Sequence, residues 1–231
     1  MARPSRNLDR ALLAAGRALL PEVGCAGLTI RQVAEVAGVN IGMFHYHFKT
    51  REAFLRAVLQ SVYEEMFVSF PIQAARPIDT TVTGHLRSGF RVLGRFLRDN
   101  RQLIGRILAD AISGDAVARE FLRDNAPRHV TLLAGLIAEG QRRGELKDMP
   151  VPQALAFCAG AFGSPIILGG AIADSGQVPK AVAQQLAAAI FSEAAIEQRI
   201  DLALNALGAA PPSPRKTAKP AATRRYNRTR D

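Results

Sequence analysis

Apolar residues recur every three to four positions along most of the chain, and alternating apolar and polar runs are scarce. This periodicity predicts an all-α protein, because an α-helix turns once in 3.6 residues and buries one face. In the first 70 residues it divides into four expected helices, at about 7–20, 29–37, 41–48 and 51–70. Pro21, Gly24 and Gly27 are expected to end the first of them at Leu20.

Strong start and stop signals bound the second and third helices. Thr29 and Gln32 form a capping-box pattern, in which each side chain bonds a backbone N–H of the other residue. Gly38 is expected to end this helix in a left-handed conformation, and Asn40 to cap the next one. Two short helices joined by the turn 38–40 predict a helix-turn-helix, whose second helix enters the major groove of DNA.

The apolar pattern continues after a Pro-containing linker at 71–77. The expected helices of this second part are 80–100, 101–112, 116–143, 152–173 and 179–207. The chain is therefore expected to contain an N-terminal domain at 1–70 (the head), a helical body at 71–208 and a disordered basic tail at 209–231. The fourth helix would link the head to the body.

An uncharged stretch at 149–173 is long enough to cross a bilayer as a helix. Its many Ala, Gly and Pro residues and its lack of flanking aromatic belts favour a buried helix and no membrane partner. Pro165 is expected to kink it. Its small residues would permit close helix packing; they are Ala156, Gly160, Ser164, Gly169 and Gly170.

The net charge of +10 is concentrated at the two ends of the chain. Residues 1–51 carry seven basic and three acidic side chains, and the tail carries seven basic side chains against Asp231 alone. Basic ends on a neutral body suit a protein that contacts a polyanion. The tail either adds phosphate contacts or only solubilises the chain, and the sequence does not separate these alternatives.

Two cysteines, Cys25 and Cys158, show neither metal-ligand spacing nor a disulfide framework, which favours a reducing compartment. The polar N-terminus does not look like a signal peptide. We therefore expect a cytoplasmic protein without a metal or another cofactor.

The segment from Leu28 to Phe54 resembles the head of the TetR family of transcriptional regulators almost position by position. The closest matches are Val33-Ala34, Ala37-Gly38-Val39, Gly42, Tyr46-His47-Phe48-Lys49 and Glu52. The resemblance covers about residues 7–60; past residue 70 only an all-helical body of suitable length is recognisable.

The resemblance implies a role for each residue of this motif. Residues expected to lie near DNA phosphates are Thr29, Arg31, Tyr46, His47 and Lys49, with Arg51 as a further neighbour. Residues expected to face base edges are Ile41, Gly42, Met43 and His45, where His45 also reaches the DNA backbone. Asn40 would cap the helix, and Phe44 and Phe48 would belong to the core.

The motif departs from the family pattern at Ile41 and Met43, where polar residues are common. Apolar side chains there suggest contact with thymine methyl groups, so our hypothesis is an operator with A·T pairs at these positions. His45 and His47 resemble a metal-binding pair, but residues two apart do not share a helix face. We therefore expect them to contact DNA.

The sequence leaves the roles of several residues of the body open. Arg87, Arg91 and Arg95 form a stripe that is either a solvated basic face or part of a ligand cavity for an acidic effector. His85, Asp110 and His129 are polar residues in apolar surroundings, and we expect them to be satisfied or exposed. No catalytic constellation is apparent, so the protein is not expected to be an enzyme.

The resemblance also implies how such a protein works. The last two helices would form a homodimer, and the body would bind a small-molecule effector that controls a sequence-specific repressor on a double-stranded DNA operator in the nucleoid. One alternative is a helical small-molecule-binding protein or enzyme with a vestigial head. Another is a non-specific nucleoid-binding protein driven by charge.

Overall fold

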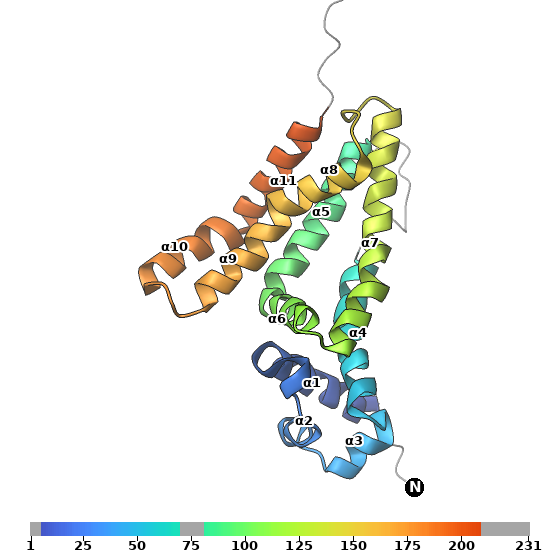
Figure 1. Ribbon diagram of the computed structural model, residues 1–231, viewed down its shortest axis with the longest axis vertical. Coiled ribbons are helices and arrows are strands. Elements are labelled where there is room, and N and C mark those ends of the chain that lie inside the picture. Colours follow the sequence, from blue (N-terminus) through green and yellow to red (C-terminus); the bar gives the residue numbers. More distant parts are fainter. Residues whose placement is uncertain (1–5, 70–80, 209–231) are drawn as a thin grey trace, which may run out of the picture.

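The described part of the chain folds mainly into helices, as the periodicity predicts (Figure 1). The structure is a computed structural model that describes residues 6–69 and 81–208. Its helices are α1 (Arg6–Gly27), α2 (Ile30–Ala37), α3 (Ile41–Phe48), α4 (Arg51–Val68), α5 (Val82–Asp99), α6 (Arg101–Ile112), α7 (Ala116–Arg142), α8 (Val151–Cys158), the π-helix η2 (Ala159–Gly163), α9 (Ser164–Asp174), α10 (Lys180–Phe191) and α11 (Glu193–Leu207). The expected linker at 71–77 and tail at 209–231 lie outside the described residues.

The head packs α1, α2, α3 and the first part of α4 around one apolar core. The side chains at its centre are fully buried; they are Leu12, Cys25, Val33, Phe44, Phe54, Leu55 and Val58. Residues of α6 and of the start of α7 join the same core, among them Leu103, Ile107 and Ala118. The head is thus packed directly against the body.

The first helix is longer than the sequence predicts. Helix α1 continues through Pro21 to Gly27, with a single non-helical residue at Gly24 (φ 71°). A proline inside a helix removes one hydrogen bond, but the last turns of α1 bury Leu20 and Cys25 in the head core. This burial offsets the local cost of Pro21.

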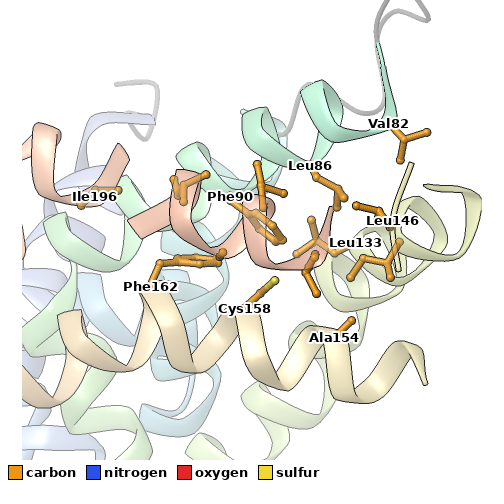
Figure 2. Close-up of a cluster of buried hydrophobic side chains, with 14 of the residues drawn as sticks. Val82, Leu86, Phe90, Leu133, Leu146, Ala154, Cys158, Phe162 and Ile196 are labelled. Carbon is orange, nitrogen blue, oxygen red and sulfur yellow. The ribbon is translucent and has the colours of Figure 1, made fainter. Parts of the chain in front are cut away.

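A second core fills the body, between α5, α7, α8, η2 and α11 (Figure 2). Phe90 of α5 and Phe162 of η2 meet there with ring centroids 4.9 Å apart. Helix α4 reaches both cores, because Val62 lies in the head core and Tyr63 and Met66 lie in the body core. Head and body therefore share one continuous helix.

The uncharged helix is only half covered by the body. One face, with Ala154, Cys158, Phe162 and Ile166, is buried, whereas Leu168 is 63% exposed. The span Val151–Asp174 is long and apolar enough to cross a membrane, and 33% of its most apolar 18-residue window is buried inside the protein. The disturbance expected at Pro165 takes the form of the π-helical turn η2 just before it.

The last expected helix is two helices. A single helix at 179–207 is wrong, because the chain turns at Ser192 (ψ 147°) between α10 and α11. The Ser192 hydroxyl accepts a hydrogen bond from the Ala195 N–H (3.2 Å), and this N-cap begins α11. The signal was the Ser–Glu pair within an otherwise Ala-rich stretch.

The arginine stripe of α5 pairs with acidic residues of α11. Arg87 binds Asp201, Arg91 binds Glu197, and Arg95 binds Glu193. These pairs join two helices at a half-exposed seam, so the stripe is neither a free basic face nor part of a cavity for an acidic effector. Hydrogen bonds from these arginines lower the pKa of Glu193 and Glu197.

The close packing of α1 on α4 depends on Gly16. A Cβ atom at Gly16 would lie 2.6 Å from Phe54 Cζ, within the head core. We expect Gly16→Ala to lower the free energy of unfolding by about 1–3 kcal/mol. Gly135→Ala is the matched control, because a Cβ there meets nothing within 4 Å, and it is expected to stabilise by about 0.5–1 kcal/mol. Urea denaturation followed by circular dichroism measures both, and equal stability of Gly16→Ala and the wild type would contradict the packing argument.

Candidate nucleic-acid interface

Helices α2 and α3 form the expected helix-turn-helix. The capping box of Thr29 and Gln32 is present, and Gly38 ends α2 with φ 67°. The Asn40 side chain accepts from the Met43 N–H (2.9 Å) and begins α3. The local signals alone therefore fix the bounds and the turn of this unit.

One face of α3 is open and the other is held by aromatic packing. Phe44 is fully buried, and its ring and that of Phe48 each lie 5.0 Å from the ring of Phe54 in α4. These contacts fix the rotation of α3, so its outer residues point away from the core.

The residues singled out from the sequence, which lie at the start of α2 and along α3, are all at least partly exposed. Those that are exposed are Thr29, Arg31, Asn40, Ile41, Gly42, His45, Tyr46 and Lys49, and those that are half-buried are Met43 and His47. Tyr46 is 64% exposed and Ile41 is 47% exposed. A large aromatic and a branched apolar side chain held in water on a short helix are typical of a contact surface.

The two histidines of α3 have different surroundings. His45 Nδ1 lies 3.1 Å from the Lys49 carbonyl oxygen, so the imidazole closes the C-terminal end of α3. His47 Nε2 is buried and has no hydrogen-bond partner. Within 6–69 and 81–208, no group of three His, Cys, Asp or Glu side chains is placed to hold a metal ion.

Lys49 adopts a strained backbone conformation between α3 and α4. Its φ of 60° and ψ of −55° form a γ-turn, closed by the Thr50 N–H donating to the Phe48 carbonyl (2.6 Å). A side chain in this region costs about 1–3 kcal/mol, and such strain clusters at functional sites. Lys49, directly after α3, is exposed.

The last turns of α1 and the residue that follows them, together called the α1–α2 connection (23–28), are held by side chains of α4 and α6. Arg51 donates to the carbonyls of Cys25, Ala26 (3.0 Å) and Leu28 (2.6 Å), so its guanidinium is engaged inside the head instead of facing a phosphate. The Asp110 carboxylate accepts from the Cys25 N–H at 2.7 Å.

Arg106 completes this attachment from the same face of α6. Its guanidinium pairs with Asp110 (3.1 Å) and donates to the Val23 carbonyl (3.3 Å). Gly24 leaves room for it, because a Cβ there would collide with the guanidinium. Sequence reasoning found Asp110 but not its partners; the Arg–Asp spacing of four residues in an apolar helix was the available signal.

Both thiols are buried, as expected for cysteines without metal or disulfide partners. Burial, with the negative charges of Asp115 and Asp110, raises the pKa of Cys25 to about 12. Burial also raises the pKa of Cys158 to about 11. Neither thiol is a reactive nucleophile at neutral pH.

A cavity of about 210 Å³ lies in the body, bounded by α4, α5, α6, α7 and α9. Its walls are apolar apart from Tyr63, Asn125 and His129. Sequence reasoning noted His129 but missed the other two. The spacing of Asn125 and His129, one turn apart in an apolar helix, was a usable signal, whereas Tyr63 comes from a distant helix.

The strain at Lys49 can be tested by two substitutions that remove the same charge. Lys49→Gly is expected to raise the free energy of unfolding of the protein by about 1 kcal/mol, because glycine adopts positive φ without the steric cost. Lys49→Ala keeps that cost and is expected to gain nothing. Urea denaturation compares the two, and equal stability of both variants would rule out strain at this turn.

Comparisons with known proteins agree with this geometry. Residues 12–58 match the model of bacterial regulatory proteins of the tetR family. YttP of Bacillus subtilis, named as an HTH-type transcriptional regulator, is 24% identical over 136 residues, which are 58% of this chain and 65% of YttP. The matched region thus spans slightly less than two thirds of that relative.

Solved structures share the fold across both domains. The TetR family transcriptional regulator PfmR from Thermus thermophilus is 16% identical, with a TM-score of 0.58 over 87% of this chain and 98% of PfmR. A regulator from Saccharomonospora viridis, solved in complex with choline, is 17% identical, with a TM-score of 0.62 over 85% of this chain and 95% of that chain. The head sequence of this chain is thus similar to that of the tetR family of bacterial regulatory proteins, and its whole helical architecture is similar to that of these solved structures.

Proposed function

We propose that this protein is a sequence-specific DNA-binding transcriptional regulator that acts as a homodimer and represses its target until a small molecule binds. The observation that carries the proposal is the exposed face of α3, which is held rigidly by aromatic packing within the segment that matches the family model. A helix of this kind fits the major groove, where base edges are distinguishable.

The residues of the exposed face divide by chemistry. Tyr46 and Lys49 carry a hydroxyl and an ammonium group, which bind phosphate oxygens, and exposed Thr29 and Arg31 lie at the start of α2 where a phosphate can approach. Ile41 is the side chain best placed for an apolar contact with a thymine methyl group. Gly42, Met43 and His45 complete the base-facing set, with His47 as a further phosphate neighbour.

DNA binding can be tested by fluorescence anisotropy with the DNA that flanks the protein's own gene. At physiological salt we expect at least about 10³-fold tighter binding than to random duplex of equal length. Lys49→Ala should weaken binding to both the flanking and the random DNA. It should also lower the slope of the logarithm of the binding constant against the logarithm of the salt concentration by about 0.9, because one phosphate contact is lost. Ile41→Ala should instead reduce the preference for A·T over G·C pairs facing α3.

Arg123→Ala is the matched control, since it removes one positive charge from an exposed site on α7 in the body. It should leave the salt slope unchanged. Equal affinity for flanking and random DNA would favour a non-specific nucleoid-binding protein. No binding at low salt would favour a small-molecule-binding protein or enzyme with a vestigial head.

The homodimer proposal rests on the uncovered face of α8 and α9. Exposed residues follow one face of these two helices and form what is called the uncharged strip. They are Gln153, Ala156, Phe157, Gly160, Ser164, Leu168 and Ile172. Helix α10 packs beside α9 on the same flank of the body and exposes Val182 (Figure 1). Small residues at the centre of the strip allow a second copy of the helix to approach closely, so that a four-helix interface forms.

Light scattering after gel filtration tests this interface. We expect the wild type to have twice the 24.9 kDa chain mass and Leu168→Glu to be monomeric, because a buried unpaired carboxylate is costly. Val130→Glu places the same charge on an exposed apolar position of α7 and should remain dimeric. A monomeric wild type would contradict the proposal, and a wild type that is recovered only in detergent would favour the membrane alternative.

A response to a small molecule is supported by the position of α6. Leu103 and Ile107 of α6 line the cavity, while Arg106 and Asp110 hold the α1–α2 connection. A ligand that binds one arrangement of α6 more tightly therefore favours one position of the head. In a dimer this changes the spacing of two heads that must match half-sites about 34 Å apart.

As part of this proposal, the protein acts in the cytoplasm, associated with the nucleoid through its operator. The proposal gives it no catalytic role, in line with a family of regulatory proteins. The basic tail remains a candidate for additional phosphate contacts, which deletion of residues 209–231 and measurement of the salt slope would test.

A further inference from the structure

The cavity of the body has a chemical character that points to one kind of ligand. It has 17 lining residues, and their polar side chains are those of Tyr63, Asn125 and His129. No Lys, Arg, Asp or Glu is among them. A charged ligand group inside the cavity would therefore lose water without gaining an ionic partner.

The nearby charged side chains are already engaged outside the cavity. Arg128 pairs with Glu64 and lies over the ring of Phe67, 4.0 Å from its centroid. Arg91 and Arg95 of α5 are bound to α11. An anionic ligand would have to break one of these pairs to obtain a cation.

The hydrogen bonds among the polar lining residues leave His129 Nε2 as an acceptor, whereas Asn125 Oδ1 lies 3.5 Å from Arg128 Nη1. The Tyr63 hydroxyl donates its one proton to the Asn125 carbonyl at 2.7 Å, and the same oxygen lies 3.1 Å from His129 Nδ1. Nδ1 must then carry the proton of a neutral imidazole and donate it to Tyr63, so Nε2 is left as an acceptor. Both donors of the Asn125 amide are used, on Gln60 Oε1 and the Phe121 carbonyl.

The protonation state of His129 agrees with this arrangement. Burial lowers the pKa of His129, so the ring is neutral at neutral pH. A neutral acceptor at the end of an apolar chamber matches a ligand with one hydroxyl or N–H donor.

We propose that the effector is an uncharged, mainly hydrocarbon molecule with one hydroxyl group, which occupies the cavity and donates a hydrogen bond to His129. This inference rests on the proposed function only in using the cavity as the effector site. The proposed ligand class excludes carboxylic acids. It also excludes quaternary amines, such as the choline in the structure of the Saccharomonospora viridis regulator.

The ligand class can be measured on the full-length protein without DNA. N-phenyl-1-naphthylamine, an uncharged probe, should fluoresce strongly on binding; the chain contains no tryptophan, so the protein background is low. At pH 7.5, 1-decanol should displace the probe at a concentration at least tenfold lower than decanoate or decylammonium. Equal or better displacement by either ion, or no binding of the probe, would overturn the proposal.

Two variants locate the site. Ala126→Phe fills the cavity and should abolish probe binding, whereas Thr131→Phe places the same ring on an exposed position of α7 and should not. Thermal unfolding shows whether each variant is folded. Probe binding by a folded Ala126→Phe variant equal to that of the wild type would place the ligand elsewhere and contradict the proposal.

His129→Leu tests the hydrogen bond. It should lower the affinity for 1-decanol about fivefold, the effect of one hydrogen bond, and leave the affinity for a methyl ether of equal length unchanged. An equal loss for both ligands would show that His129 only shapes the wall and would overturn its role as acceptor.

The effect of 1-decanol on operator affinity is then measured separately. If 1-decanol binds as expected but saturating 1-decanol leaves the affinity for the operator unchanged, the result contradicts the proposed ligand response and supports the proposed ligand class. If decanoate binds more tightly and releases DNA, the ligand class fails and the regulatory function stands.

Discussion

The position of the head depends on a few backbone groups at the C-terminal end of α1 and just after it, which side chains of other helices hold. Arg51 of α4 and Asp110 and Arg106 of α6 bond carbonyl and N–H groups from Val23 to Leu28. Without them these groups would be left unpaired in a partly buried turn, which is costly. The orientation of the helix-turn-helix is therefore set from the body as much as from its own core, and this is the physical basis of the ligand control that we propose.

Much of the head could be predicted from the sequence, because its signals are local. Thr29, Gly38 and Asn40 act on backbone groups within a few residues of themselves, so their effect is readable without the tertiary fold. The end of α1 could not be predicted, since burial of distant apolar surface outweighs the local effect of Pro21. Apolar composition alone likewise does not tell an internal face from an uncovered one, so the sequence predicts the apolar helix at 152–173 but not which of its faces, the uncharged strip, is uncovered.

In the body, both the ion pairs of α5 and the lining of the cavity depend on residues that are far apart in the sequence. The α5 stripe could be recognised from its spacing, but its partners on α11 lie about a hundred residues further along the chain, and no local pattern links them. The cavity is likewise formed by residues of five helices, and of its three polar side chains the sequence analysis singles out only His129. The arginines of the stripe pair with carboxylates of α11, and none of these charged residues lines the cavity, whose walls are apolar apart from Tyr63, Asn125 and His129.

The π-helical turn η2 keeps the two halves of a long helix in phase. In a regular α-helix, positions four residues apart rotate by about 40° at each step, so three steps would carry a side chain about a third of the way around the axis. The wider turn of η2 absorbs part of this drift, and the core side chains from Ala154 to Phe162 therefore stand in one row (Figure 2). Deletion of one residue from Ala159–Gly163 would rotate α9 about its axis relative to α8. The α9 part of the uncharged strip would then turn toward the core, and Ile166 would turn toward solvent. The length of this segment, more than its composition, thus decides which surface the protein offers to another molecule.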